Sequence, residues 1–471
     1  MSAWEPIADQ AVAKRLARAV LSIDASALTP LALAQARMCL VDAMGVALAG
    51  TAERACQVLR ATPGVATAPG RSLVFGSRIR TSALDATLVN GTAAHALDYD
   101  DFSSIMGGHH TVPLMPALLA VGEEMALSGR RVVLAYIAGV EVEIRLARAL
   151  GFHHYDKGWH PTSTLGTFGA AASVSHLLQS TEDQTTTALA IAASLASGIK
   201  ANFGTMVKPL HAGQCGRNGL LAALLARGGF DANEAAFEHH QGFLNVFNGA
   251  ATFELAKLFE GWAAPLEIEG DTIALKQFPC CGSTHAAIAM MLRLRREEGI
   301  AAGDVAAIEI LPHGRRLRHT DNPLPQTALE AKFSVQYATV RALLDGTVKL
   351  ADFEDGRFAE PAVRKLLAVT MARAHPDMPD DAEEQWGAEV IVTLHDGKRL
   401  ARRIDQLVGR GGKSPMTRAE MWDKFEDCAR RALPRERLPV LFDLLYRIDE
   451  LDDINILTRE LEATVAAAGS R

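Results

Sequence analysis

The most regular pattern along the chain is helical, because apolar residues recur at the three- and four-residue spacing of a buried helix face. Residues 29–49 predict the clearest helix, with Thr29 as N-cap, Pro30 at the first helical position and Gly50 at the end. Further helices are expected at residues 82–97, 113–128, 131–150, 162–178, 185–196 and 217–227. Small residues on their faces (Gly166, Gly169, Ala170, Ala171) predict close approach between helices.

The pattern becomes mixed near residue 265. Residues 304–311 predict a strand, and residues 388–394 and 399–404 predict a β-hairpin whose turn contains Asp396 and Gly397. The helices expected in this region are residues 284–298, 331–344 and 361–373. Strands and helices mixed in this way indicate an α+β unit.

The helical pattern returns after residue 405, with helices expected at 418–433 and 438–449. Thr417 and Glu420 have the spacing of a capping box. We therefore predict a mainly α protein: a large all-helical domain built from both chain ends, with an inserted smaller α+β lid domain. The predicted boundaries are residues 1–268 and 403–471 for the helical domain and 269–402 for the lid.

Composition and charge exclude several classes of protein. With 48 Lys plus Arg against 55 Asp plus Glu, the net charge of −7 argues against a nucleic-acid partner. Residues 1–14 lack the pattern of a signal peptide, and we expect no apolar run of the roughly 20 residues that span a bilayer. The six cysteines show no zinc-type spacing, which indicates reduced thiols in a cytoplasmic protein.

One glycine-rich stretch, residues 409–414, resembles a phosphate-binding loop only superficially. Leu407 stands where the motif needs its first glycine, and Pro415 would disrupt the helix that should follow. We interpret this stretch as a connector before a capped helix.

The first candidate for chemistry is the sequence NGTAAHALDYDD (residues 90–101), followed by GGHHT (residues 107–111). Asp98, Asp100 and Asp101 repel one another unless cations or a ligand compensate their charge. The alternative is a solvated loop with a capping aspartate, although the flanking residues are apolar.

Three further clusters contain histidine, lysine or cysteine. His160 stands at a predicted helix start beside Trp159 and Pro161, where it is placed to titrate near neutral pH or to act as a buried cap. Lys208, followed by His211, lies in a stretch with few other charges, which favours an anionic partner over a lysine that only reaches for solvent.

The last cluster, KQFPCCGSTH (residues 276–285), lies at the predicted joint between the domains, where pockets often form. Cys280 or Cys281 could act as a nucleophile beside His285, but a packed thiol is the commoner role. Together, the clusters predict a small anionic carboxylate substrate and proton abstraction next to a carboxylate, with cations stabilising the enolate-like charge.

These motifs give the chain a resemblance to the MmgE/PrpD family, which includes 2-methylcitrate dehydratases, cis-aconitate decarboxylases and iminodisuccinate epimerases. The resemblance rests on NGTAAHALDYDD, GWHPTSTLGTFGAAAS, GTMVKPLHAGQCGRNG, KQFPCCGSTH, EAKFSVQYATVRALLDG and GGKSPMT…DKFEDCA, in family order over nearly the whole chain. It implies a helical domain with an α+β lid, a homodimer, and an active site in the cleft between domains without a metal or an organic cofactor.

The resemblance also implies the site residues. Asp100 and His109 are the expected acid/base groups, His160 a second proton carrier or carboxylate ligand, and Lys208 and Lys276 the cations that hold carboxylates or an enolate. The expected substrate-binding residues are Asp98, His110, His211 and His285.

The chain departs from the family pattern at two places that are expected to line the pocket. Phe102-Ser103 stand where Thr-His is usual, and His109-His110-Thr111 stand where His-Pro-Ser is usual. Both departures bear on which substrate the protein takes.

We therefore expect a cofactor-independent lyase or isomerase acting on a small di- or tricarboxylate, with 2-methylcitrate-like dehydration as the first hypothesis. Decarboxylation of cis-aconitate and epimerisation of iminodisuccinate use related proton chemistry and are the alternatives. Two hypotheses of other classes are a metal-dependent hydrolase using Asp98, Asp100, His109 and His160, and a non-catalytic carboxylate-binding protein. The lack of an HExxH motif argues against the first, and the cations at motif positions argue against the second.

Overall fold

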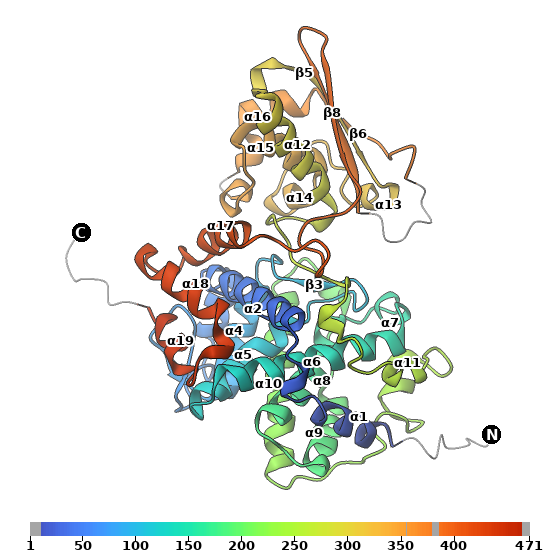
Figure 1. Ribbon diagram of the computed structural model, residues 1–471, viewed down its shortest axis with the longest axis vertical. Helices are drawn as coiled ribbons and strands as arrows, with labels where there is room; N and C mark the ends of the chain where they lie inside the picture. The colour runs from blue at the N-terminus through green and yellow to red at the C-terminus, as the bar shows by residue number, and fades with distance from the viewer. Residues whose placement is uncertain (1–10, 355, 379–385, 464–471) are drawn as a thin grey trace. The chain divides into compact units, whose positions relative to one another are not determined.

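The computed structural model describes residues 11–354, 356–378 and 386–463 (Figure 1). The chain forms two compact units. The first comprises Met1–Leu275, Arg410–Lys413 and Thr417–Arg471, and the second comprises Lys276–Gly409 and Ser414–Met416. Most of the N-terminal stretch in which we expect no signal peptide lies outside the described residues. A lid function for the second unit stays a prediction.

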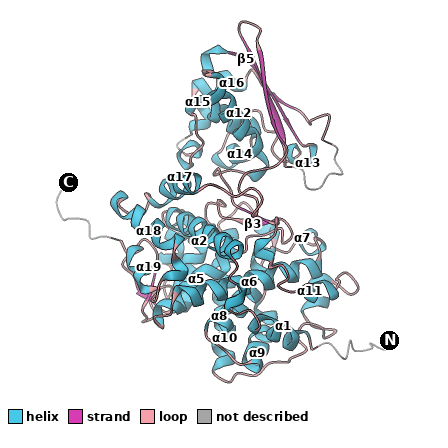
Figure 2. Ribbon diagram, viewed as in Figure 1, coloured by secondary structure: helices cyan, strands magenta, loops and turns pink. Residues whose placement is uncertain are grey.

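The described chain is mainly α, as predicted, and helices dominate the first unit (Figure 2). Its α-helices are α1 Val12–Leu21, α2 Pro30–Gly50, α3 Arg54–Ala61, α4 Ala83–His95, α5 Thr111–Glu124, α6 Gly129–Leu150, α7 His153–Asp156, α8 Pro161–Leu177, α9 Glu182–Leu195, α10 Val207–Arg227, α11 Ala256–Phe259, α17 Arg418–Ala429, α18 Leu438–Tyr446 and α19 Asn455–Glu460. Two short antiparallel pairs complete it: β1 Ser72–Leu73 with β2 Arg80–Thr81, and β3 Phe102–Ser103 with β4 Ile273–Ala274.

Helix α2 begins and ends where the sequence predicts. The Thr29 side chain accepts a hydrogen bond from the Ala32 amide at 3.0 Å, and Pro30 occupies the first helical position. By length and composition α2 could cross a membrane, so the expectation that no apolar run is long enough is wrong for this helix. However, 78% of its most apolar window is buried inside the fold, as in the core helix of a globular domain.

Helices α4 and α10 approach closely because glycines meet at their contact. A Cβ atom on Gly91 would lie 2.7 Å from Gly213 Cα, and one on Gly213 would lie 2.1 Å from the Leu88 carbonyl oxygen. Any larger side chain would therefore push the helices apart. This contact brings the end of α4, at His95, near the first turns of α10.

Helix α10 begins ten residues earlier than the sequence predicts, at Val207 instead of residue 217. Pro209 does not prevent this, because the first turn of a helix has backbone N–H groups without helical partners in any case. The extension places Lys208 and His211 on successive turns at the helix start.

The second unit combines a mixed sheet with helices (Figure 2). Its helices are α12 His285–Glu298, α13 Gly314–Leu317, α14 Ala328–Lys332, α15 Val335–Asp345 and α16 Pro361–Leu367. The strands, in the spatial order β6-β5-β7-β8, are β5 Val305–Pro312, β6 Thr370–Ala372, β7 Ala388–Leu394 and β8 Arg399–Ile404. Inward side chains such as Ile308, Ile310 and Val390 pack with Ile288 and Met291 of α12 in one buried core.

Two predictions in this unit are wrong in detail. The helix expected at 361–373 ends at Leu367, and Thr370–Ala372 instead pairs in parallel with β5, because the open edge of β5 offers hydrogen-bond partners. The helix expected at 331–344 is two helices, since Ser334 adopts an extended backbone and caps the second helix at the Tyr337 amide.

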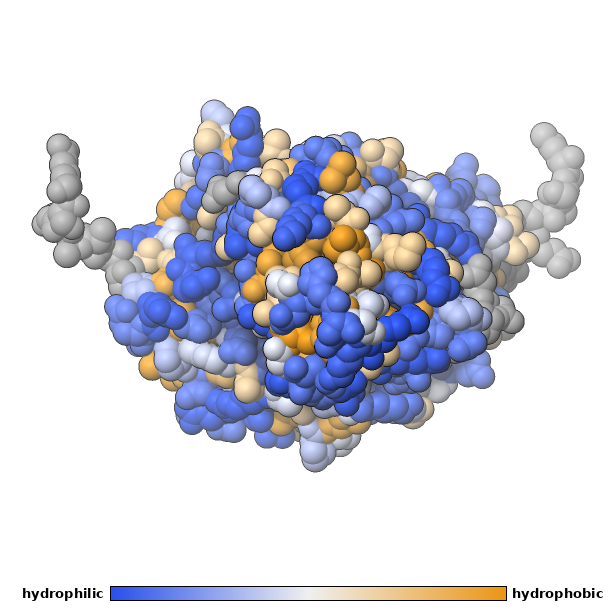
Figure 3. All heavy atoms as spheres, turned by 90° about the horizontal axis from the view of Figure 1, so that it is seen from above, coloured by the Kyte–Doolittle hydropathy of each residue, from blue (hydrophilic) through white to orange (hydrophobic). Residues whose placement is uncertain are grey.

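The face drawn in Figure 3 is mostly hydrophilic, with hydrophobic residues gathered in a smaller area near its centre. The homodimer, the absence of nucleic-acid and membrane partners, and the cytoplasmic location stay predictions.

Candidate active site

The carboxylates of the first candidate cluster lie on the loop between α4 and β3. Helix α4 ends at His95, and the chain turns through Asp98, whose φ of 51° lies in the left-handed region. Aspartate tolerates this conformation better than most residues. The Asp98 side chain is 40% exposed, whereas the Asp100 and Asp101 side chains are fully buried.

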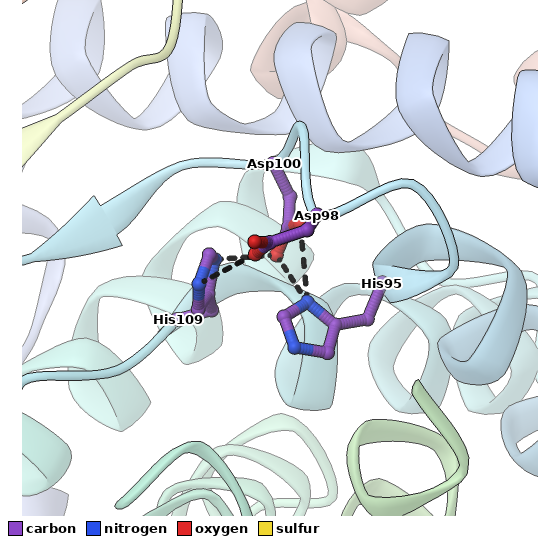
Figure 4. Close-up of side chains that lie close together, drawn as sticks. All are labelled: His95, Asp98, Asp100 and His109. Atoms are coloured by element: carbon purple, nitrogen blue, oxygen red, sulfur yellow. Dashed lines mark hydrogen bonds and ion pairs between the residues drawn. The ribbon is translucent and has the colours of Figure 1, made fainter. Parts of the chain in front are cut away.

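Asp100 lies between two imidazole rings (Figure 4). One of its oxygens is 2.9 Å from His95 Nδ1 and 2.8 Å from His109 Nδ1. Burial alone would raise the pKa of Asp100, but the attraction of His109 and His95 holds it well below its ordinary value. Because an ionised carboxylate only accepts hydrogen bonds, the proton of each ring faces Asp100 from Nδ1.

The two contacts differ in quality. His95 Nδ1 makes a hydrogen bond to Asp100, whereas the N–H of His109 Nδ1 is not aligned with the carboxylate oxygen despite the short distance. We therefore describe the second contact as an ion pair. The strength of this ion pair depends on the position of the Asp100 carboxylate relative to the His109 ring.

The backbone holds His109 from two sides. Its amide donates to Thr162 Oγ1 at 2.9 Å, and Ser103 N donates to the Gly108 carbonyl at 2.8 Å. A Cβ atom on Gly108 would lie 2.7 Å from the Thr162 amide, so this approach requires glycine. These contacts leave the Nε2 edge of the His109 ring 3.3 Å from Asp98.

A cation completes this group. Lys208 Nζ lies 2.9 Å from Asp98 Oδ1 and 5.3 Å from the centre of the Phe203 ring. Asp98 thus lies between Lys208 and His109 Nε2. A substrate carboxylate that displaced Asp98 would meet both the lysine's positive charge and an imidazole nitrogen.

His160 and His211 form a second imidazole pair. His160 is the N-cap of α8, and its Nδ1 lies 3.1 Å from Nδ1 of His211. Burial lowers the pKa of both histidines, so both are neutral at pH 7 and one donates while the other accepts. His160 also stacks on His95, with ring centres 5.8 Å apart.

The structure therefore brings together six of the predicted residues in the first unit: Asp98, Asp100, His109, His160, Lys208 and His211. His110 is not with them. It is fully buried and lies 3.4 Å from Asp101, in a different cluster with Cys39. Because His110 faces Asp101 and Cys39 and not the group around Asp98, its predicted contact with substrate lacks support.

Lys276 and His285 belong to the second unit and are both nearly buried. His285 Nε2 lies 3.3 Å from the Cys280 carbonyl oxygen, so the histidine contacts the cysteine backbone instead of its thiol. Burial raises the pKa of the Cys280 thiol to about 12, which disfavours a thiolate nucleophile.

One of the two departures from the family pattern, at Phe102, lies beside His109. The Phe102 ring centre is 6.4 Å from that of His109, so an aromatic ring lies beside this imidazole.

Among the residues that the structure describes, two groups of side chains could hold a metal ion. Ligand atoms of His95, Asp98, Asp100 and His109 lie within 4.8 Å of one another, and so do those of Cys39, Asp101 and His110. The donor set of the first group suits a divalent cation, but the Lys208 ammonium already neutralises Asp98 and would repel such an ion.

Sequence reasoning missed the role of two residues near the site. His95 appeared within a motif but was not a candidate, although a histidine at a helix end five residues before an aspartate could have signalled it. Lys424, on α17, donates to the Tyr99 carbonyl oxygen at 2.9 Å and pairs with buried Asp42. No local signal connects residue 424 with the loop at residue 99.

The site combines a buried, imidazole-bridging carboxylate with a lysine, which suits proton transfer beside an anion. Residues 14–256 match the MmgE/PrpD N-terminal domain and residues 278–442 match the MmgE/PrpD C-terminal domain. The chain therefore belongs to the MmgE/PrpD family, as its motifs predict.

Several characterised proteins are similar over nearly the whole chain. Human cis-aconitate decarboxylase is 27% identical over 464 residues, covering 96% of this chain and 95% of the human protein. The mouse cis-aconitate decarboxylase is 28% identical, covering 90% and 88% of the two chains. The 2-methylcitrate dehydratase of Cupriavidus necator is 23% identical, covering 86% and 88%. The chain is thus an enzyme of the MmgE/PrpD family, in the lyase class of these relatives.

Proposed function

We propose that the protein is a decarboxylase of cis-aconitate or a closely related unsaturated tricarboxylate. The similarity to decarboxylases at 27 to 28% identity carries this choice over dehydration, our first hypothesis, for which the similar dehydratase is 23% identical. The His109, Asp98 and Lys208 group supports it chemically.

The reaction needs a proton donor and a cation. In cis-aconitate, the carboxylate on the CH2 carbon is lost as CO2, and its bonding electrons form a new C=C bond. The electrons of the old double bond move to the carbon beside the far carboxylate, and that carbon takes one proton. The negative charge that develops in the transition state is spread into that far carboxylate, so a nearby ammonium group stabilises it.

Each residue has a role in this scheme. Lys208 binds the far carboxylate in place of Asp98, and His109 delivers the proton from Nε2. Asp100 stabilises the protonated ring from the Nδ1 side, as the carboxylate of a catalytic triad does for its histidine. In the neutral pair of His160 and His211, the ring that accepts at Nδ1 carries its proton on Nε2 and donates a hydrogen bond to the substrate.

A panel assay tests this proposal. Purified protein is incubated separately with cis-aconitate, citrate, 2-methylcitrate and iminodisuccinate, and products are identified by proton NMR together with released CO2. We expect CO2 and a five-carbon unsaturated diacid from cis-aconitate alone. Loss of water from 2-methylcitrate without CO2 release would replace decarboxylation by dehydration, and turnover of iminodisuccinate would indicate epimerisation.

We also propose that catalysis needs no metal ion, because Lys208 supplies the positive charge at Asp98. Dialysis against a chelator, followed by metal analysis, should leave the rate unchanged. Activity that disappears with the metal and returns with one divalent ion would instead assign that ion to the His95, Asp98, Asp100 and His109 group.

A further inference from the structure

His95 is a buried histidine at the end of α4 to which the reaction scheme gives no role. Only 1% of the residue is exposed. Its Nδ1 lies 2.9 and 3.1 Å from the two oxygens of Asp100, while its Nε2 is buried and has no hydrogen-bond partner among the described residues. An unpaired buried acceptor disfavours folding, so the hydrogen bond on the other side of the ring calls for an explanation.

We propose that His95 is a positioning residue, which donates its Nδ1 proton to Asp100 and fixes this carboxylate against His109. The inference rests on the proposed use of His109 as proton carrier and not on which carboxylate is the substrate. His95 itself touches neither substrate nor proton in transit.

The contacts of Asp100 carry this argument. In the described part of the chain, its side chain contacts two groups, the Nδ1 atoms of His95 and His109. The His109 contact is short but poorly aligned, so it does not fix the carboxylate by itself. The aligned hydrogen bond from His95 supplies the missing restraint, in the way that a supporting partner orients a functional group.

The surroundings keep His95 neutral and therefore able to act as a simple donor. The charged and titratable groups that face it are Asp100 and His109 from the loops, His160 at the start of α8, and Lys208 with His211 on α10. Burial is the main reason that the pKa of His95 is lowered to about 4, with His109 and Lys208 adding to the effect and Asp100 opposing it.

Two amide substitutions separate this function from mere packing. Asparagine can place an amide N–H near the position of His95 Nδ1, whereas glutamine places it near Nε2, away from Asp100. We expect H95N to keep kcat within about fivefold of wild type and H95Q to lose about 100-fold, with little change in KM, which corresponds to the lower end of a general acid's contribution. H176Q is the matched control, since Nε2 of the distant His176 donates to the Ile23 carbonyl and glutamine preserves that bond.

The split between kcat and KM gives a readout that a packing defect would not produce. Without the His95 donor, Asp100 is no longer held against the His109 ring, so kcat should fall in H95Q but not in H95N, while KM stays near the wild-type value in both. Equal loss of activity in both variants would assign His95 to packing only. Full activity in H95Q would overturn the proposal as well.

A substrate-free measurement separates this inference from the proposed function. Nitrogen-15 NMR of histidine-labelled protein records the His109 ring signals in wild type, H95N and H95Q at one pH. We expect these signals to change in H95Q alone. Identical His109 signals in all three proteins would overturn the role of His95, whereas wild-type protein that turns over no carboxylate would overturn only the proposed function.

Discussion

Two pairs of neighbouring residues in this protein carry the same side chains and face opposite environments. Asp100 and His109 meet beside Lys208 and the half-exposed Asp98, whereas Asp101 and His110, one position further along, meet in a closed interior. Burial and the neighbouring carboxylate raise the pKa of Asp101 to about 7, although a hydrogen bond from Thr111 opposes this, while two imidazoles hold that of Asp100 well below its ordinary value.

The difference shows that partner groups, not residue type or burial, decide what a carboxylate can do. Both aspartates are fully buried. Asp100 faces Nδ1 of the neutral His95 ring and Nδ1 of His109, and is therefore ready to stabilise a positive charge on His109. Asp101 accepts hydrogen bonds from neutral groups such as Thr111 Oγ1, at 2.5 Å, and favours its protonated form.

The largest effect should come from replacing the Asp100 carboxylate by an amide. The same replacement at Asp101 provides the comparison. D100N removes the negative charge behind His109, and we expect kcat/KM to fall about 1,000-fold or more, as when the carboxylate of a catalytic triad is neutralised. D101N should reduce it less than about tenfold, because a carboxyl group with a pKa of about 7 is already partly protonated near neutral pH. Steady-state kinetics on the same substrate would compare them, and equal losses would refute the distinction.

Removal of the cation should have the next largest effect. K208M takes away the charge that stabilises the far carboxylate, and we expect a loss of about 100-fold or more in kcat/KM. K257M is the matched control, because Lys257 pairs with Glu254 at the surface. Unchanged kinetics in K208M would remove Lys208 from the mechanism.

The buried ion pair between Lys424 and Asp42 should affect the stability of the fold and not the rate of the reaction. Lys424 pairs with fully buried Asp42 and holds the loop through the Tyr99 carbonyl oxygen. K424M leaves a buried carboxyl group without its cation, so we expect the free energy of unfolding to fall by about 3 kcal/mol. Urea denaturation measures this, and the double variant D42N/K424M should recover part of the loss. A single variant as stable as wild type would contradict the buried pair.

The smallest effect is a dependence of stability on pH. The folded state raises the pKa of Asp101 to about 7, so it binds more protons than the unfolded state between that value and the ordinary pKa of 3.8. This contribution to stability is therefore lost as pH rises. D101N lacks this loss, and we expect it to gain at least about 1 kcal/mol relative to wild type between about pH 5 and pH 8.

The same experiment on the other aspartate should give the opposite sign. The folded state lowers the pKa of Asp100, so its contribution to stability is present above pH 3.8 and is lost only on acidification. D100N should thus be less stable than wild type at neutral pH, with no gain as pH rises from about 5 to about 8. If the stability of D100N and D101N changed with pH in the same way, the contrast between the two aspartates would be refuted.

Local signals in the sequence predicted much of the fold. The cap at Thr29, the capping box at Thr417 and the hairpin turn at Asp396-Gly397 all depend on residues within a few positions of one another, and the structure has each of them. The strand Thr370–Ala372 could not be predicted in this way, because it exists through pairing with a strand about 60 residues earlier.

The same limit applies to the site. Motifs drew attention to Asp100, His109, His160 and Lys208, but they also placed His110 against the substrate. Which of two adjacent histidines faces the carboxylate depends on the backbone contacts of Gly108 and His109 with Thr162, more than 50 residues away. His95 was missed for a similar reason, since its meaning comes from the turn that returns Asp100 to the end of α4.

The most direct test of proton delivery by His109 is to locate the transferred proton in the product. Wild-type protein turns over cis-aconitate in deuterium oxide, and NMR locates deuterium in the product. We predict one deuterium, on one face of the carbon beside the far carboxylate, because a single positioned acid delivers it as CO2 leaves. A product without solvent deuterium at that carbon, or with deuterium on both faces in equal amounts, would contradict proton delivery by His109.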